Sequence, residues 1–277
     1  MAAVRPEKTM KVAIGVSTYN RRQLVELSAA SLRSSSIPPD TVLIVVDDAS
    51  TDYDVDYLRS IYPSFSDVRR RSENSGGASF ANWDVMRQLL ETDADAVLLL
   101  DSDLLVNSNF LDLGVSLLRD TDGVLSLFNT PNHPDMGARG PFVLKKSIGC
   151  AGTLWLRDIA AKVFSEVPAG SQWDWRFSDF LVKAGVAICV LRDSLVQHVG
   201  YSNGQNSNFG SGDFGVGFTD SDAKNAYRLT ELLLADSQAK FLRIQEEIDA
   251  LKTRVRTIEH RSFLYRGFRH LSRRLLS

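Results

Sequence analysis

The sequence predicts an α/β fold in which a mostly parallel sheet is flanked by helices. Segments with strand and helix patterns alternate through the first 130 residues, which is typical of parallel sheets with helical crossovers. The strand-like segments are short runs of apolar, often β-branched residues, as expected for strands buried on both faces. Of the 277 residues, 44% are hydrophobic and 24% are charged, a globular composition that excludes a wholly disordered chain.

Apolar runs and helical spacing define the elements expected along the chain. Strands are predicted at residues 11–17, 41–46, 67–71, 96–100, 123–129 and 186–191. Helices are predicted at residues 22–33, 52–62, 79–90, 109–119, 158–164 and 177–183. Residues 131–149 have an irregular pattern and are expected to form an active-site flap or loop. Residues 200–218 contain six glycines and are expected to be either a lid over a bound ligand or a disordered linker.

Two regions are expected, an α/β domain at residues 10–220 and a helical region at residues 221–277. Between residues 241 and 258, apolar side chains recur at alternating spacings of three and four, which is the pattern of a coiled-coil seam. In a parallel dimer the facing g and e positions carry opposite charges, and these pairs are Glu247 with Lys252 and Arg254 with Glu259. A homodimer through this helix and a helix packed on its own domain are the two alternatives.

The end of the chain is strongly basic, although the whole chain has a net charge of −2. Residues 254–277 contain seven Arg and one Glu, so the preceding 253 residues carry a net charge of −8. The near-neutral total argues against nucleic acid as a partner. Residues 261–277 mix Arg with Leu and Phe, which predicts a basic amphipathic tail. This tail either contacts an anionic membrane surface or forms a solvated face of a docked helix.

The expected location is the cytoplasm, with any membrane contact peripheral and at the inner face. Residues 1–10 lack the apolar core of a secretory signal. The longest apolar run, residues 96–100, is far shorter than the roughly 20 residues that span a bilayer. Cys150 and Cys189 are too few for a disulfide scaffold and are expected to be reduced, partly buried thiols.

Polar side chains follow three of the predicted strands at their carboxyl ends. These corners are Ser17-Thr18, Asp47-Asp48 and Asp101-Ser102-Asp103. Ligands of open α/β sheets bind beyond the carboxyl ends of the strands, so three polar corners favour a ligand site over helix caps and turns. Two carboxylates one residue apart can share a hard divalent cation, which would neutralise charge on a diphosphate.

Four motifs occur in order along the chain. They are V-S-T-Y-N-R at residues 16–21, D-D-A-S-T-D at residues 47–52, E-N-S-G-G-x-x-x-A-N at residues 73–82 and L-D-S-D at residues 100–103. Together they resemble the nucleotide-sugar-binding half of the GT-A glycosyltransferases, in particular the family 2 type, over about residues 10–205. The resemblance implies a GT-A fold with a C-terminal helical extension, and a nucleotide-sugar donor, with a UDP-sugar favoured.

The resemblance also implies a role for each matching position. Asp103 and His198 would ligate Mn²⁺ or Mg²⁺, and Asp101 would face the ribose or a metal-bound water. Asp47 would contact the nucleotide or brace its loop. The positions that would bind the nucleotide sugar are Ser17, Thr18, Tyr19, Asp48, Asn74, Gly76, Gly77 and Asp101.

Asp174 is the general base that we expect from the same comparison. It lies eleven residues before Gly185, the spacing that the family commonly shows, although Trp173 stands where the family commonly has Glu. Trp173 and Trp175 are expected to contact the acceptor and to form an apolar wall that raises the pKa of Asp174. Asp179 is the alternative base, and a helix-capping role for Asp174 is a further alternative.

These observations predict an inverting, metal-dependent glycosyltransferase that acts on a saccharide or lipid-linked acceptor of a surface polysaccharide or other glycan. Inversion is expected because the sequence offers a base candidate and no evident covalent nucleophile. Two alternatives stay open. A nucleotidyltransferase of related sheet architecture usually has a Gly-rich, basic loop after the first strand, which this chain lacks. A non-catalytic assembly subunit would dock through the C-terminal helix.

Overall fold

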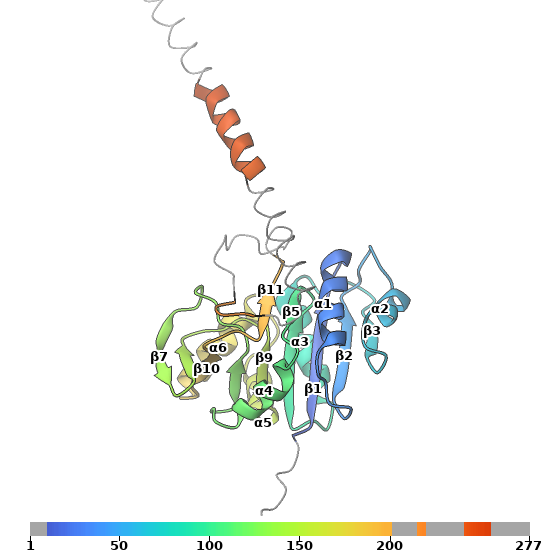
Figure 1. The fold of residues 1–277 in the computed structure, drawn as a ribbon, viewed down its shortest axis with the longest axis vertical. Helices are drawn as coiled ribbons and strands as arrows, with labels where there is room; N and C mark the ends of the chain where they lie inside the picture. Colours follow the sequence, from blue (N-terminus) through green and yellow to red (C-terminus); the bar gives the residue numbers. More distant parts are fainter. Residues whose placement is uncertain (1–9, 201–214, 220–240, 256–277) are drawn as a thin grey trace, which may run out of the picture. The chain divides into compact units, whose positions relative to one another are not determined.

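The structure, a computed structural model, describes residues 10–200, 215–219 and 241–255 (Figure 1). The chain divides into two compact units, residues 1–227 and 228–277. Most of the predicted lid and the whole basic tail lie outside the described residues. Within the described ranges, no helix has the length and apolar character needed to cross a membrane.

A mixed sheet forms the centre of the first unit (Figure 1). In the described part of the chain it has nine strands, in the order β3-β2-β1-β4-β9-β6-β10-β8-β7. The strands are β1 (Val12–Thr18), β2 (Val42–Asp47), β3 (Asp67–Arg70), β4 (Ala96–Asp101), β6 (Val124–Ser126), β7 (Asp135–Arg139), β8 (Phe142–Lys145), β9 (Thr153–Leu156) and β10 (Ile188–Leu191). Strands β3, β2, β1 and β4 are parallel, and β9 runs antiparallel to β4 and β6. A second, two-stranded antiparallel sheet pairs β5 (Leu104–Val106) with β11 (Val196–His198).

Helices contribute to two apolar cores on the two faces of the sheet. One core receives side chains from α1 (Arg22–Ser34), α2 (Val55–Ile61) and α4 (Phe110–Leu118). The other receives side chains from α3 (Ala78–Leu90), α5 (Arg157–Glu166) and α6 (Trp173–Lys183). Successive strand residues alternate between the cores, so that Ile14 lies in the first and Ala13 in the second. Burial on both faces explains why the central strands are continuous apolar runs.

The predicted fold class is confirmed: a mostly parallel central sheet is flanked by helices, and a helix spans residues 241–255. The prediction of an irregular loop at residues 131–149 is wrong, because β7 and β8 form an antiparallel pair there. Strand β7 is largely exposed and its five residues include Asp, Gly and Arg, so no apolar run marked it. Strands β5, β9 and β11 were also not predicted, since runs of three or four residues carry little periodic signal.

Strand register brings the polar corners to one edge of the sheet. Ser17 of β1 is opposite Asp101 of β4, and Thr18 is opposite Asp47 of β2. The small sheet adds His198, which is opposite Leu104 and therefore close to Asp103, two residues after the end of β4. These side chains come from distant parts of the sequence and meet because the central strands are parallel.

Gly15 sets the distance between β1 and α3. A Cβ atom at this position would lie 2.9 Å from Cδ1 of Leu89 and closer still to Cγ1 of Val85. We predict that Gly15→Ala lowers the free energy of unfolding by about 1–3 kcal/mol, because α3 must shift away from the sheet. Urea unfolding measures this change. Gly149→Ala is the matched control, because the nearest atom there is 3.9 Å away. Equal losses in the two variants would contradict the close packing.

Candidate active site

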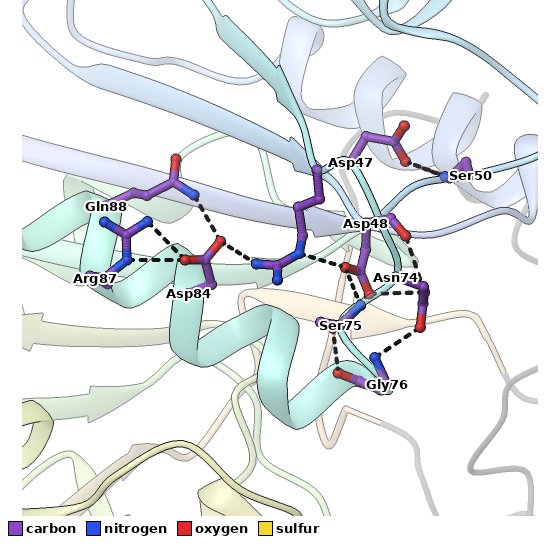
Figure 2. Close-up of polar contacts among 11 residues, drawn as sticks. Asp47, Asp48, Ser50, Asn74, Ser75, Gly76, Asp84, Arg87 and Gln88 are labelled. Carbon is purple, nitrogen blue, oxygen red and sulfur yellow. Dashed lines mark hydrogen bonds and ion pairs between the residues drawn. The ribbon is translucent and has the colours of Figure 1, made fainter.

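The carboxylate of Asp48 ties the end of β2 to the loop before α3 (Figure 2). Its Oδ1 accepts a hydrogen bond from the backbone N–H of Ser75 at 2.9 Å and lies 3.1 Å from Nε of Arg71. Its Oδ2 accepts from the Ser75 hydroxyl at 2.7 Å and from the Asn74 amide at 3.0 Å. Burial raises the pKa of Asp48, although the Ser75 and Arg71 contacts oppose this effect. Both oxygens are thus engaged by protein groups, and Asp48 fixes the loop predicted to pass beside the nucleotide.

Two Arg side chains extend this bracing, and sequence analysis singled out neither. Nη1 of Arg71 lies 2.7 Å from Oδ2 of Asp84 on α3, which joins the Asp48 loop to that helix (Figure 2). Nη1 of Arg70 lies 2.9 Å from the fully buried carboxylate of Asp47, which also accepts from the backbone N–H of Ser50 at 3.1 Å. Asp47 therefore braces the loop after β2.

Gly76 and Gly77 have φ angles of 94° and 145°, which side-chain-bearing residues seldom adopt. A Cβ atom on either glycine would meet no atom within 4 Å. Among the residues that the structure describes, no neighbouring atom would clash with a side chain at either position. The backbone conformation is therefore the reason for the two glycines. The carbonyl oxygen of the Asn74 side chain accepts from the N–H of Gly76 at 2.9 Å and stabilises the turn.

The hydroxyls predicted to contact the nucleotide are directed into the protein. Ser17 donates to the Asn82 side-chain oxygen at 2.6 Å, and the hydroxyl of Thr18 hydrogen-bonds to that of Tyr53. The Asn82 amide in turn donates to Oδ1 of Asp101 at 3.0 Å. Ser17 and Thr18 therefore position other groups. Their main chains lie in the β1 ladder, where the carbonyl of Thr18 also accepts from the N–H of Asp48 at 2.8 Å. Asn82 stands in the third motif, so that motif was the signal that could have identified it.

Asp103 lies at the same edge and contacts two basic side chains. It is 3% exposed, and its Oδ2 lies 2.8 Å from Nη1 of Arg21 and 3.2 Å from Nε2 of His198. Burial raises the pKa of Asp103, but the positive charges of His198 and Arg21 outweigh it and lower this pKa to about 2. Burial and the charge of Asp103 raise the pKa of Asp101 to about 6. The two carboxylates thus repel each other, and a bound cation would relieve that repulsion.

Asp103 and His198 fit a divalent metal ion. Oδ1 of Asp103 is buried and accepts no hydrogen bond from any residue that the structure describes, so it has an unused acceptor position. No cluster of three or more His, Cys, Asp or Glu side chains suited to a metal occurs in the described ranges. Two protein ligands suffice for Mg²⁺, which commonly keeps water and substrate phosphate oxygens in its coordination shell.

Asp174 lies in the first turn of α6, and Asp179 is exposed on the same helix. Oδ1 of Asp174 accepts from the backbone N–H of Trp175 at 3.0 Å, and burial raises the pKa of Asp174. Burial also raises the pKa of Cys150, and the charges of Asp174 and Asp101 raise it further. Oδ2 of Asp174 would lie 4.0 Å from a Cβ atom on Gly149, so the candidate base lies beside the segment that precedes β9.

The prediction that both indoles contact the acceptor is wrong for Trp173. Its side chain is fully buried, packs edge-on against Phe177 and donates to the carbonyl of Val167 at 3.2 Å, so it has no free face. Trp175 is 41% exposed, and its ring centroid lies 5.3 Å from that of His133. Nδ1 of His133 lies 2.9 Å from the hydroxyl of Ser147. The structure thus adds His133, which sequence analysis left without a role, to the surface beside Asp174.

The fold and this edge of acidic and polar groups define a GT-A protein. Residues 13–165 match the profile described as "Glycosyl transferase family 2". The match covers more than half of the chain, and the chain therefore belongs to glycosyl transferase family 2. No curated protein sequence matches it.

Several solved structures resemble the chain. S. aureus TarS 1–349 in complex with UDP-GlcNAc is 21% identical with a TM-score of 0.50, and the match covers 68% of this chain and 57% of that chain. The same TarS fragment in complex with UDP is 18% identical with a TM-score of 0.50, and the match covers 82% of this chain and 65% of that chain. The mannosyltransferase PcManGT from Pyrobaculum calidifontis in complex with GDP-Man and Mn²⁺ is 20% identical with a TM-score of 0.48, covering 68% and 59%. The chain thus spans less than two thirds of each of these chains, and likeness at this identity shows the fold.

Asn82 generates a prediction about the stability of the site. Asn82→Asp removes the donor to Asp101 and places a negative charge beside it, so we expect a loss of roughly 2–3 kcal/mol in the free energy of unfolding. Urea unfolding at neutral pH measures this loss. The matched control is Asn109→Asp, the same change at the exposed N-cap of α4, where we expect a change within about 0.5 kcal/mol. A similar effect at both positions would show that the Asn82 bridge does not stabilise the fold.

Proposed function

We propose that the chain is an inverting glycosyltransferase that moves a sugar from a nucleotide-sugar donor to an acceptor hydroxyl. The observation that carries this proposal is the meeting of Asp101, Asp103 and His198 beyond the carboxyl ends of β1 and β4, in a member of glycosyl transferase family 2. Family membership leaves the nucleotidyltransferase alternative without support. The alternative of a non-catalytic subunit is decided by whether purified protein transfers sugar.

The donor side of the proposed site consists of the braced loops at the ends of β1 and β2. Tyr19, Asp48, Asn74 and the two glycines of the following turn are the proposed contacts for the base and ribose. Both oxygens of Asp48 already accept hydrogen bonds from the protein, so Asp48 contacts a nucleotide only if one of these hydrogen bonds breaks. A UDP-sugar is the favoured donor, and the similar TarS structure holds UDP-GlcNAc.

A divalent ion, Mn²⁺ or Mg²⁺, held by Asp103 and His198 would offset the negative charge that develops on the leaving diphosphate. Asp101 is proposed to accept a hydrogen bond from the ribose or from a water bound nearby. Its orientation is already set by the amide of Asn82 at 3.0 Å. Such preorganisation favours binding, because the side chain of Asp101 does not have to be ordered when the donor arrives.

Asp174 is proposed to remove the proton from the acceptor hydroxyl as that oxygen attacks the anomeric carbon from the face opposite the diphosphate. A single displacement of this kind inverts the anomeric configuration. The partly buried carboxylate has a raised pKa, which makes it a stronger base than an exposed Asp. The exposed ring of Trp175 and the half-buried ring of His133 offer a face for the acceptor, which we propose to be a saccharide or lipid-linked saccharide.

The function is tested by Asp174→Asn in a transfer assay with a panel of nucleotide sugars. We expect turnover to fall at least 100-fold while donor binding, followed by calorimetry, stays within about threefold, because the amide cannot accept the proton. In the unmodified protein, kcat/KM should fall as the pH is lowered through the raised pKa of Asp174, since only the carboxylate is a base. Asp179→Asn is the matched control on the same helix. Full turnover in Asp174→Asn would assign the base to another residue.

We further propose that the helix at residues 241–255 pairs with a second copy of this chain. Its apolar seam is exposed, from 41% at Ile248 to 67% at Phe241. Glu247 and Lys252 occupy g and e positions of opposite charge, which favours a parallel partner with the same sequence. A homodimer would cover the seam and pair these charges.

The dimer is tested by Ile248→Glu in the full chain, with mass measured by light scattering. A charge at a seam position should halve the mass, because burying an unpaired carboxylate in the interface is costly. Thr253→Glu introduces the same charge on the opposite side of the heptad and should leave the mass unchanged. A monomeric unmodified chain, or equal masses for both variants, would refute the pairing.

A further inference from the structure

Arg21 forms an ion pair with the carboxylate of Asp103, which we propose as a metal ligand. Its Nη1 lies 2.8 Å from Oδ2 of Asp103, and Nε2 of His198 lies 3.2 Å from the same oxygen. The other oxygen of Asp103 accepts no hydrogen bond from the described residues. A divalent ion that binds through Asp103 would therefore compete with the guanidinium for this carboxylate.

Local preferences disfavour Arg at position 21. Asn20 and Arg21 have φ angles of 51° and 59°, a left-handed conformation that residues other than Gly adopt at a cost. Arg21 is also the N-cap of α1, where it makes no capping hydrogen bond and brings positive charge to the positive end of the helix dipole. A residue that breaks local rules in this way, beside a candidate site, points to a functional role.

The conformation is imposed by the loop after β2. The backbone N–H of Asn20 donates to the hydroxyl of Ser50 at 2.8 Å, and the Asn20 carbonyl accepts from the hydroxyl of Tyr53 at 3.1 Å. The Asn20 side chain accepts from the backbone N–H of Thr51 at 2.7 Å. These bonds hold the turn independently of the Arg21 side chain, which is thereby directed toward Asp103.

Gly200 shows that the ion pair is closely covered. A Cβ atom at this position would lie 3.2 Å from Nη1 of Arg21 and closer still to Oδ2 of Asp103. The segment after β11 therefore passes directly against the pair, and only a residue without a side chain avoids displacing it. The pairing of Arg21 with Asp103 is part of a packed arrangement rather than a chance contact at the surface.

We propose that Arg21 is an internal counter-ion that competes with a divalent metal ion for Asp103. The inference rests on the metal site of the proposed function. Without metal, Arg21 balances the buried charge of Asp103. Its competition raises the free metal concentration needed to fill the site. Metal then binds more readily when donor phosphates add further ligands, so that metal and donor binding become coupled. Arg21 acts as a positioning residue through Asp103.

The test measures the binding of Mn²⁺ to the full chain without donor. The electron paramagnetic resonance signal of free Mn²⁺ reports how much metal is bound. We expect Arg21→Gly to bind Mn²⁺ about tenfold more tightly, the size expected when a charge-assisted hydrogen bond no longer competes. Gly adopts the left-handed conformation without strain, so the turn is retained. Arg21→Lys keeps the charge and should stay within about threefold of the unmodified chain. Arg22→Gly removes the same charge one residue away, where Arg22 pairs with Glu26, and should leave the affinity for Mn²⁺ unchanged.

A second arm shows whether the effect acts through Asp103. The tighter binding should disappear when Arg21→Gly is combined with Asp103→Asn. Unchanged or weaker Mn²⁺ binding in Arg21→Gly would overturn the inference, as would a gain that persists in the double variant. Arg21→Asn, which also tolerates the left-handed turn, replaces Arg21→Gly if that variant fails to fold. Tighter Mn²⁺ binding without any sugar transfer would refute the proposed function while supporting the counter-ion.

Discussion

The parallel pairing of β1 with β2 and β4 is the constraint on which the candidate site depends. This pairing places Thr18 opposite Asp47 and Ser17 opposite Asp101, so that polar groups far apart in the sequence meet at one edge. A shift of one residue would turn every side chain of β1 to the opposite face and place a side chain, in place of Gly15, against Val85 and Leu89 of α3. The close packing of Gly15 therefore helps to specify the register, and the register specifies the site.

The sequence was informative where burial imposes a pattern. The run at β2 is apolar because both faces of that strand are covered, and the acidic corner after it follows from the end of the strand. The hairpin of β7 and β8 could not be predicted, because β7 is exposed and gains its stability from pairing with a neighbour. The contact of His198 with Asp103 likewise depends on a short pairing of β11 with β5.

The two tryptophans of α6 show a different limit. Trp173 and Trp175 are two residues apart, so a helix directs them to different sides. Trp173, Phe177 and Leu181 recur every four residues and form the buried stripe, which leaves Trp175 outside. That spacing was visible in the sequence, but the helix was predicted to begin only at residue 177. The direction of the Arg21 side chain, in contrast, could not be predicted from local spacing. It results from hydrogen bonds between Asn20 and a loop about 30 residues away.

The antiparallel strand β9 lies between two parts of the sheet, to which the proposed function assigns different tasks. On one side, β3, β2, β1 and β4 carry the proposed donor contacts. On the other side lie β6, β10, β8 and β7. Helix α6, which carries the proposed base and Trp175, packs in a core to which both parts of the sheet contribute. Few of the side chains that would recognise an acceptor belong to the parallel half. Under the proposed function, a change in the loops and aromatic surface of the distal half would alter acceptor specificity and leave the proposed nucleotide contacts in place.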